Sequence, residues 1–137
     1  MSNVVFVLGA GASHASGAPL MANFLDVASD LVRARRVDNK QEHFDRVFEA
    51  IGGLQVVHSK AQLDLNNIES IFTALELGKI IQRVPGLDST KIEQTIASLK
   101  EVIVKTLEVT IPFPTRKSHI GIPKPYDAFA GILKYLR

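Results

Sequence analysis

Cysteine is absent from this sequence, and so is tryptophan. Without cysteine the chain can form no disulfide, use no thiol as a nucleophile and build no cysteine-ligated zinc site. Aromatic residues make up only 7% of the chain, so a core must be packed mainly from aliphatic side chains. Sixteen basic and fourteen acidic residues give a net charge of +2, which is too small an excess to indicate nucleic-acid binding.

Long hydrophobic runs are absent as well. The apolar run near the N-terminus, Val4–Leu8, has five residues. A membrane span needs about 18, and the charged n-region of a signal peptide is missing. We therefore expect a cytoplasmic protein with no membrane partner. What the chain does have is 137 residues, 46% of them hydrophobic, which is enough for one domain with a core.

The run Val4–Leu8 is also the best candidate for a strand. It is continuously apolar, rich in β-branched residues and stopped by Gly9. A short run of this kind predicts a strand buried on both faces, as in a parallel sheet that is covered by helices.

The rest of the chain has mainly helical patterns. Apolar spacing predicts a first helix over Pro19–Arg36, with Leu20 on its inner face, and a second from Phe44 that ends at Gly52-Gly53. Leu54–Val57 is a short strand or an extended link. Asn66 or Asn67 caps the next helix, whose inner residues are Ile68, Ile71, Phe72, Leu75, Ile80 and Ile81, and Pro85-Gly86 marks a turn. The helix after the turn has a capping-box pair at Thr90 and Glu93, with Asp88 and Ser89 as rival caps, and is stopped by Pro112 and Pro114. A basic loop Thr115–Pro125 and an amphipathic segment Tyr126–Arg137, with Phe129, Ile132, Leu133 and Leu136 inward, complete the chain.

One strand and about five helices do not make a balanced sheet. A strand buried on both faces needs partners for its backbone groups, and no second strand of similar quality follows. The simplest interpretation is that the chain is the front part of a larger α/β domain whose other strands lie beyond Arg137. The alternative is a complete helical protein with one odd apolar end.

The segment that carries chemistry is the glycine-rich stretch from Gly9 to Pro19. It reads Gly-Ala-Gly-Ala-Ser-His-Ala-Ser-Gly-Ala-Pro. Glycine removes the β-carbon where a backbone turns sharply and approaches a pyrophosphate, and successive backbone amides then face the anion. Ser13 adds a hydroxyl donor, and Pro19 can open the following helix.

Two common phosphate loops do not fit this stretch. A dinucleotide fingerprint needs a third glycine where His14 stands and an acidic residue after a second strand, whereas Asp26 and Asp30 fall inside the predicted helix. A Walker loop needs a Lys-Ser/Thr pair that is missing. A dehydrogenase is therefore disfavoured.

A third pattern fits all of its fixed positions. Gly-Ala-Gly-x-Ser-x-x-x-Gly-x-Pro resembles the NAD-binding loop of the sirtuin superfamily. Asn67–Phe72 resembles the helix that follows in the SIR2-like domains of bacterial antiviral defence proteins. The deacylase branch continues with Asp-Phe-Arg after the proline and carries a four-cysteine zinc module. This chain has Leu20-Met21-Ala22 and no cysteine, so the defence branch is the closer match.

The resemblance implies a Rossmann-like α/β fold of the SIR2 type over residues 1–137. It implies NAD as ligand or substrate, with no metal. The residues expected to hold NAD are Gly9, Ala10, Gly11, Ala12, Ser13, Gly17 and Pro19. In an intact protein it implies hydrolysis of NAD to nicotinamide and ADP-ribose in antiviral defence, with a catalytic Asn and His beyond Arg137, and it allows homo-oligomers and further effector or sensor domains.

Other interpretations stay open beside this one. The chain could sense NAD or ADP-ribose without turnover, or be a helical interaction protein that binds no nucleotide. The residues outside the glycine-rich stretch favour ordinary roles. His14 is expected to be an exposed loop residue, and His43, His58 and His119 have no partners at metal-ligand or catalytic spacing.

Overall fold

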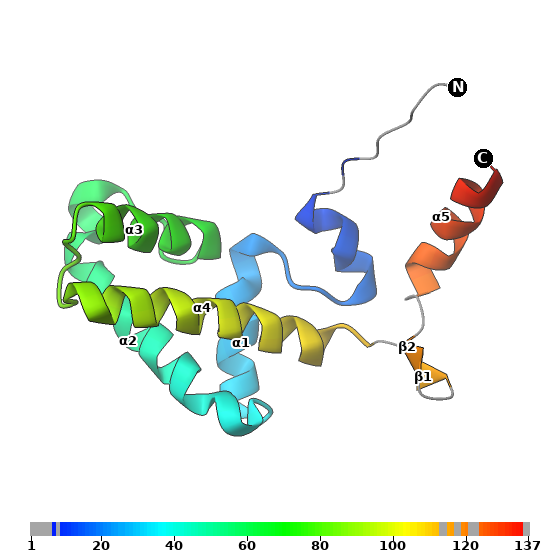
Figure 1. Ribbon diagram of the computed structural model, residues 1–137, viewed down its shortest axis with the longest axis horizontal. Helices are drawn as coiled ribbons and strands as arrows, with labels where there is room; N and C mark the ends of the chain where they lie inside the picture. The colour runs from blue at the N-terminus through cyan, green and yellow to red at the C-terminus, as the bar shows by residue number, and fades with distance from the viewer. Residues whose placement is uncertain (1–6, 8, 113–114, 117–118, 121–123, 136–137) are drawn as a thin grey trace.

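The structure is a computed structural model that describes residues 7, 9–112, 115–116, 119–120 and 124–135 (Figure 1). It is helix-rich, with 76% of the described residues in helices. The elements in order are the 3-10 helices η1 (Ala10–Ser16) and η2 (Met21–Asn23), α1 (Phe24–Arg33), η3 (Asp38–Lys40), α2 (Gln41–Ala61), α3 (Ile68–Ile80), α4 (Ser89–Thr110), the strands β1 (Thr115–Arg116) and β2 (His119–Ile120), and α5 (Lys124–Tyr135).

The expected Rossmann-like α/β fold is wrong. The one strand pair in the described residues joins β1 to β2, two residues each and antiparallel, within the segment expected to be a basic loop. Most of the predicted strand Val4–Leu8 lies outside the described residues. Its one described member, Val7, belongs to no strand and is 91% exposed. A short apolar run does not by itself fix a strand, and this one has no sheet beside it in the described part of the chain.

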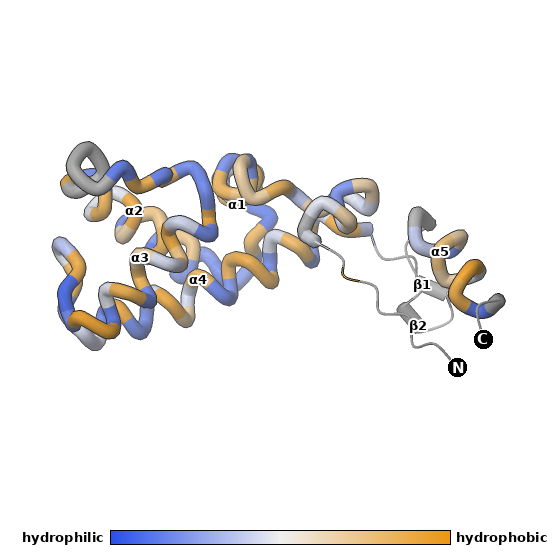
Figure 2. The backbone as a smooth tube through the Cα atoms, turned by 90° about the horizontal axis from the view of Figure 1, so that it is seen from above, coloured by the Kyte–Doolittle hydropathy of each residue, from blue (hydrophilic) through white to orange (hydrophobic). Residues whose placement is uncertain are grey.

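The core lies between α4 and the helices that pack on it. α4 contacts α1, α2 and α3 and runs along the long axis of the molecule (Figure 1). Its apolar and polar residues alternate along the tube in Figure 2, as expected for a helix with one buried stripe. The fully or nearly buried residues of α4 recur at helical spacing and are Ile92, Thr95, Ile96, Ser98, Leu99, Val102 and Thr106.

α2 is longer than the sequence predicts. The helix continues through Gly52-Gly53 to Ala61, so the predicted stop and the strand or extended link at Leu54–Val57 are both wrong. Two glycines cost about 1 kcal/mol each in a helix, but Leu54 is 3% exposed and joins the core. A β-carbon at Gly53 would lie 3.3 Å from the carbonyl oxygen of Pro85, so this glycine lets a neighbouring turn come close.

α1 begins later than predicted. Pro19 does not open it: the short helix η2 intervenes, and α1 runs from Phe24 to Arg33. Leu20 was expected on the inner face but is 39% exposed, whereas Leu25, which the pattern missed, is buried. The apolar spacing therefore located the helix but not its first turn.

The cap predicted for α3 and the turn before α4 are confirmed, whereas the cap of α4 is the rival candidate Asp88 and not the Thr90/Glu93 pair. The side chain of Asn67 accepts a hydrogen bond from the amide of Glu69 at 2.9 Å. Asp88, one of three candidate caps, accepts from the amide of Lys91 at 2.8 Å. Val84 and Leu87 form a bridge around the Pro85-Gly86 turn.

The inner stripe predicted for α3 is correct at its start and wrong at its end. Ile68, Ile71 and Leu75 are buried, but Ile80 and Ile81 are 77% and 68% exposed. α5 lies beyond the C-terminal end of α4, apart from the other four α-helices (Figure 1). Ile132 of α5 was predicted to face inward but is mostly exposed, and Leu136 lies outside the described residues. No described helix is both long and apolar enough to cross a membrane.

Candidate functional site

The glycine-rich segment folds as a short 3-10 helix with a tight exit. The amide of Ala12 donates to the carbonyl of Gly9 at 2.9 Å. At the other end, the amides of Gly17 and Ala18 donate to the carbonyls of His14 and Ser13. The seven residues of η1 are therefore helical, and their backbone is tied at both ends by these hydrogen bonds.

Gly17 is required by the fold. Its φ is +98°, in the left-handed region that favours glycine, and an added β-carbon would lie 2.5 Å from the carbonyl oxygen of Thr110. Ser16, Ala18 and Pro19 are buried around it. The second half of the segment is therefore held against the C-terminal end of α4 by packing.

Gly9 and Gly11 differ from Gly17 in backbone angle and in surroundings. All three glycines are exposed, but a β-carbon built on Gly9 or Gly11 would meet nothing within 4 Å. Neither has a positive φ. Among the described residues, nothing requires glycine at these two positions.

Tyr126 is the functional candidate that the sequence analysis missed. Its hydroxyl donates a hydrogen bond to the carbonyl oxygen of Ala12, and the tyrosine is half-buried in this contact. α5 and η1 are in contact although they lie at opposite ends of the sequence. No local pattern could indicate this pairing, because 114 residues separate the two partners.

The structure keeps the predicted NAD-binding residues on one short segment but divides them into two groups. Gly9, Ala10, Gly11, Ala12 and Ser13 form the start and first turn of η1. Gly17 and Pro19 belong to the packed second half. His14 is exposed, as expected, and its Nδ1 lies 3.1 Å from the carbonyl oxygen of Ala18. The strand that precedes such a loop in the sirtuin superfamily has no counterpart at Val7.

A buried polar network between α2 and α4 has a superficial likeness to a catalytic pair. His43 Nδ1 lies 3.1 Å from Ser98 Oγ, and Arg46 Nη1 donates to the same oxygen at 2.9 Å. Ser98 is 0% exposed, so no substrate can reach this hydroxyl. The network therefore joins the two helices, which fits the structural role expected of His43.

An ion pair extends this polar contact at the surface. Lys40 Nζ donates to Glu101 Oε2 at 2.8 Å. This hydrogen bond and the charge of Lys40 hold the pKa of the Glu101 carboxyl below its ordinary value, with a smaller contribution from His43. Nothing in this pair faces the glycine-rich segment.

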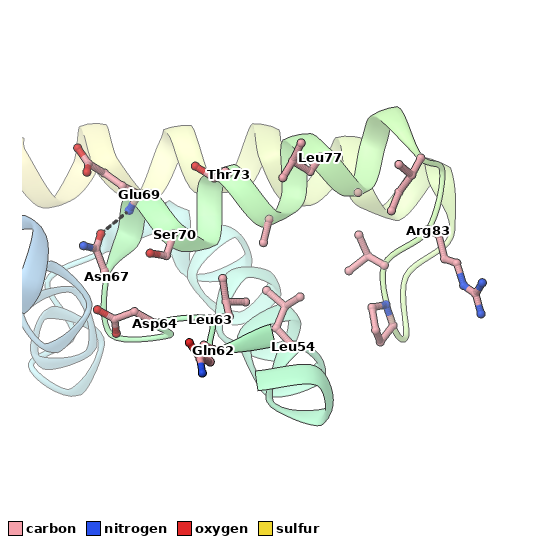
Figure 3. A pocket seen from close by; sticks show the side chains of 15 residues that line it. Leu54, Gln62, Leu63, Asp64, Asn67, Glu69, Ser70, Thr73, Leu77 and Arg83 are labelled. Atoms are coloured by element: carbon pink, nitrogen blue, oxygen red, sulfur yellow. Dashed lines mark hydrogen bonds between the residues drawn. The ribbon is translucent and has the colours of Figure 1, made fainter. Parts of the chain in front are cut away.

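A hollow lies elsewhere in the described part of the chain, along α3 (Figure 3). Its volume is about 640 Å³, and none of its lining residues belongs to the glycine-rich segment. A second hollow of about 480 Å³ is lined by Met21 of η2 together with residues of α3 and α4. Among the described residues, no three histidine or carboxylate side chains gather closely enough to hold a metal ion.

Comparison with protein-family models, with curated proteins and with solved structures gives no match to this chain. The resemblance of Gly9–Pro19 to the sirtuin superfamily therefore stays a prediction. The features of the segment that bear on its function are the uncrowded, exposed glycines at its start and the packed residues at its end.

Proposed function

We propose that the segment Gly9–Pro19 binds the diphosphate of NAD or ADP-ribose. The observation that carries this proposal is the open backbone at Gly9 and Gly11. Neither glycine is explained by its φ or by a close neighbour. A ligand that approaches the backbone closely explains both, because a side chain at either position would stand in its way.

The neighbouring residues support the same proposal. Ala10 and Ala12 carry only a methyl group, so the approach stays clear, and Ser13 supplies a hydroxyl. Successive amides at a turn can bind an anion without a parallel sheet around them, so the helical fold does not remove the basis for the proposal. Gly17 and Pro19 contribute by holding the segment on the protein.

Binding, and not turnover, is the activity that we propose for these 137 residues. In an intact protein the resemblance implies cleavage of the bond between nicotinamide and ribose, with water as the final acceptor. The Asn-Tyr-Asp segment on which that chemistry depends is missing from this sequence. A module that senses NAD or ADP-ribose is the corresponding alternative, and release of nicotinamide separates the two.

Calorimetry with NAD and with ADP-ribose tests the proposal. The chain should bind at least one of them, and Gly11→Trp should weaken binding by about tenfold or more, which corresponds to about 1.4 kcal/mol. Gly52→Trp is the matched control, because Gly52 is also exposed and also has nothing within 4 Å of an added β-carbon. A folded chain that gives no heat, or a Gly11→Trp variant that binds like the parent, contradicts the proposal.

A helical interaction protein without nucleotide is the second candidate. The observation that favours it is the exposure of large apolar side chains at the C-terminal end of α3. Leu77, Ile80 and the C-cap residue Ile81 are all more than half exposed. Single exposed apolar residues are ordinary, but a contiguous group marks an interaction surface.

A further inference from the structure

The groove along α3 has an apolar middle and charged ends. Its floor and sides come from the end of α2, the link to α3, α3 itself and the turn before α4 (Figure 3). The apolar residues that line it are Leu54, Leu63, Ala74, Leu77, Ile81, Val84 and Pro85. Gly78 faces Val84 so closely that a β-carbon would lie 2.0 Å from its Cγ2, which brings the turn against the helix.

An apolar ridge borders this groove. Leu77, Ile80 and Ile81 are 56%, 77% and 68% exposed. Residues three and four apart on a helix are neighbours, so the three side chains form one continuous surface. Leu77 and Ile81 also line the groove, whereas Ile80 stands outside it. A ridge and a groove therefore lie side by side on one face, which we call the α3 face.

The charges on the α3 face have opposite signs at its two ends. Figure 3 places Asp64 and Glu69 toward one end of the groove and Arg83 at the other. All three are exposed, and within the described part of the chain none of them belongs to an ion pair. The carboxylates lie at the N-terminal end of α3, and the guanidinium lies just past its C-terminal end.

We propose that the α3 face is the interface of a symmetric dimer of this chain. A twofold interface brings the same patch of each copy together, so that every contact occurs twice. A face with one acidic end, one basic end and an apolar centre is complementary to itself when the second copy is turned by half a rotation. The ridge of each copy enters the groove of the other, and Arg83 of each copy meets Glu69 of its partner.

A second copy of this chain satisfies both features at once. A purely apolar partner would leave Arg83 and Glu69 unpaired at the edge, and a partner of one charge would be repelled at one end. A second copy supplies a ridge, a groove and both charges in the required order. This inference does not depend on nucleotide binding, because no residue of Gly9–Pro19 takes part.

Sedimentation of the 137-residue chain from micromolar to near-millimolar concentration tests the dimer. The parent chain should show a monomer–dimer equilibrium. Ile80→Glu should raise the dissociation constant about thirtyfold or more, the effect of losing a central apolar anchor. Val104→Glu is the matched control, since Val104 is 53% exposed on α4 and does not line the groove.

A pair of charge reversals tests the twofold geometry. Arg83→Glu and Glu69→Arg should each weaken self-association, because each places like charges at both ends of the interface. An equimolar mixture should recover the dimer, since both end contacts in the mixed species then join opposite charges. Circular dichroism checks that each variant is folded.

Three results overturn the proposal. The first is a parent chain that stays monomeric at every concentration. The second is self-association that Ile80→Glu leaves unchanged. The third is a mixture of the two charge variants that fails to associate more strongly than either variant alone.

Discussion

Replacing Gly17 by alanine should loosen the glycine-rich segment from the protein. At φ +98° a β-carbon is strained before any contact is considered. The same β-carbon would also lie 2.5 Å from the carbonyl oxygen of Thr110. This neighbour is backbone at the end of a long helix, so it cannot move aside as the end of a flexible side chain would.

The expected cost has two parts. A left-handed backbone conformation costs a residue with a β-carbon about 1–2 kcal/mol, and forcing an extra carbon into a filled space costs about 1–3 kcal/mol. Together they give about 2–5 kcal/mol, a large share of the roughly 5–15 kcal/mol that stabilises a typical domain. The loss in global stability cannot exceed the free energy with which the segment packs on the end of α4, because a larger strain would detach the segment and leave the rest of the protein folded.

Urea denaturation measures the global part and amide exchange measures the local part. With a slope of about 2 kcal/mol per molar urea, a middle value for small proteins, the full loss lowers the midpoint by roughly 1–2.5 M. If the segment detaches first, the amides of Gly17 and Ala18, which donate to His14 and Ser13, exchange faster while the midpoint changes little. Gly11→Ala is the control and should be neutral or stabilising by up to about 1 kcal/mol. Unchanged midpoint and unchanged exchange in Gly17→Ala would refute the reasoning.

Three further substitutions test the helical body. Asp88→Ala removes the cap of α4 and should lower the free energy of unfolding by about 0.5–2 kcal/mol in denaturation; no loss would mean that the cap is not formed in solution. Gly78→Ala places a carbon 2.0 Å from Val84 Cγ2 and should cost about 1–3 kcal/mol, part of which Val84→Ala should restore; an additive double variant contradicts this contact. Glu101→Gln tests the pH dependence of stability. Lys40 lowers the pKa of the Glu101 carboxyl in the folded protein. The ion pair therefore stabilises the protein at pH values above the ordinary glutamate pKa, and this stabilisation is lost as the pH falls through the folded pKa. The variant should be less stable than the parent near neutral pH, and the difference should shrink on acidification, as thermal melts across that range will show.

The parts of the fold that the sequence predicted correctly are those with local causes. Asn67 and Asp88 cap helices because a short polar side chain can reach an amide two or three residues ahead. Pro85-Gly86 turns and Pro112 follows the end of α4 for equally local reasons. None of these outcomes depends on how the helices pack.

The errors have tertiary causes. Gly52-Gly53 is a local stop signal, yet α2 continues because Leu54 is buried in the core and Gly53 admits the neighbouring turn. Ile80 extends the apolar period of α3, but its side chain is 77% exposed, because the period along one helix does not say which of its residues a neighbouring helix covers. The α/β fold failed for the same reason: a run of five apolar residues says nothing of whether a sheet lies beside it.

The three glycines of the motif are present for different physical reasons, although the sequence pattern groups them together. The sequence treats Gly9, Gly11 and Gly17 as one fingerprint, whereas the structure gives Gly17 a reason of its own in its φ and in the carbonyl of Thr110. Pro19 is likewise buried by the packing around it. Agreement with the sirtuin pattern at Gly17 is therefore weaker support for a nucleotide than it first suggests, because the fold requires glycine there without any ligand.

What remains for a ligand to explain is the start of the segment. Gly9 and Gly11 have open space, ordinary backbone angles and exposure to solvent, conditions under which alanine would stabilise the unliganded chain. Glycine at these two positions lowers the stability of the unliganded chain relative to alanine, and ligand binding can offset this cost. The nucleotide proposal therefore depends chiefly on these two positions. Substitutions at Gly17 or Pro19 that abolish binding would report lost packing before they reported a lost contact with the ligand.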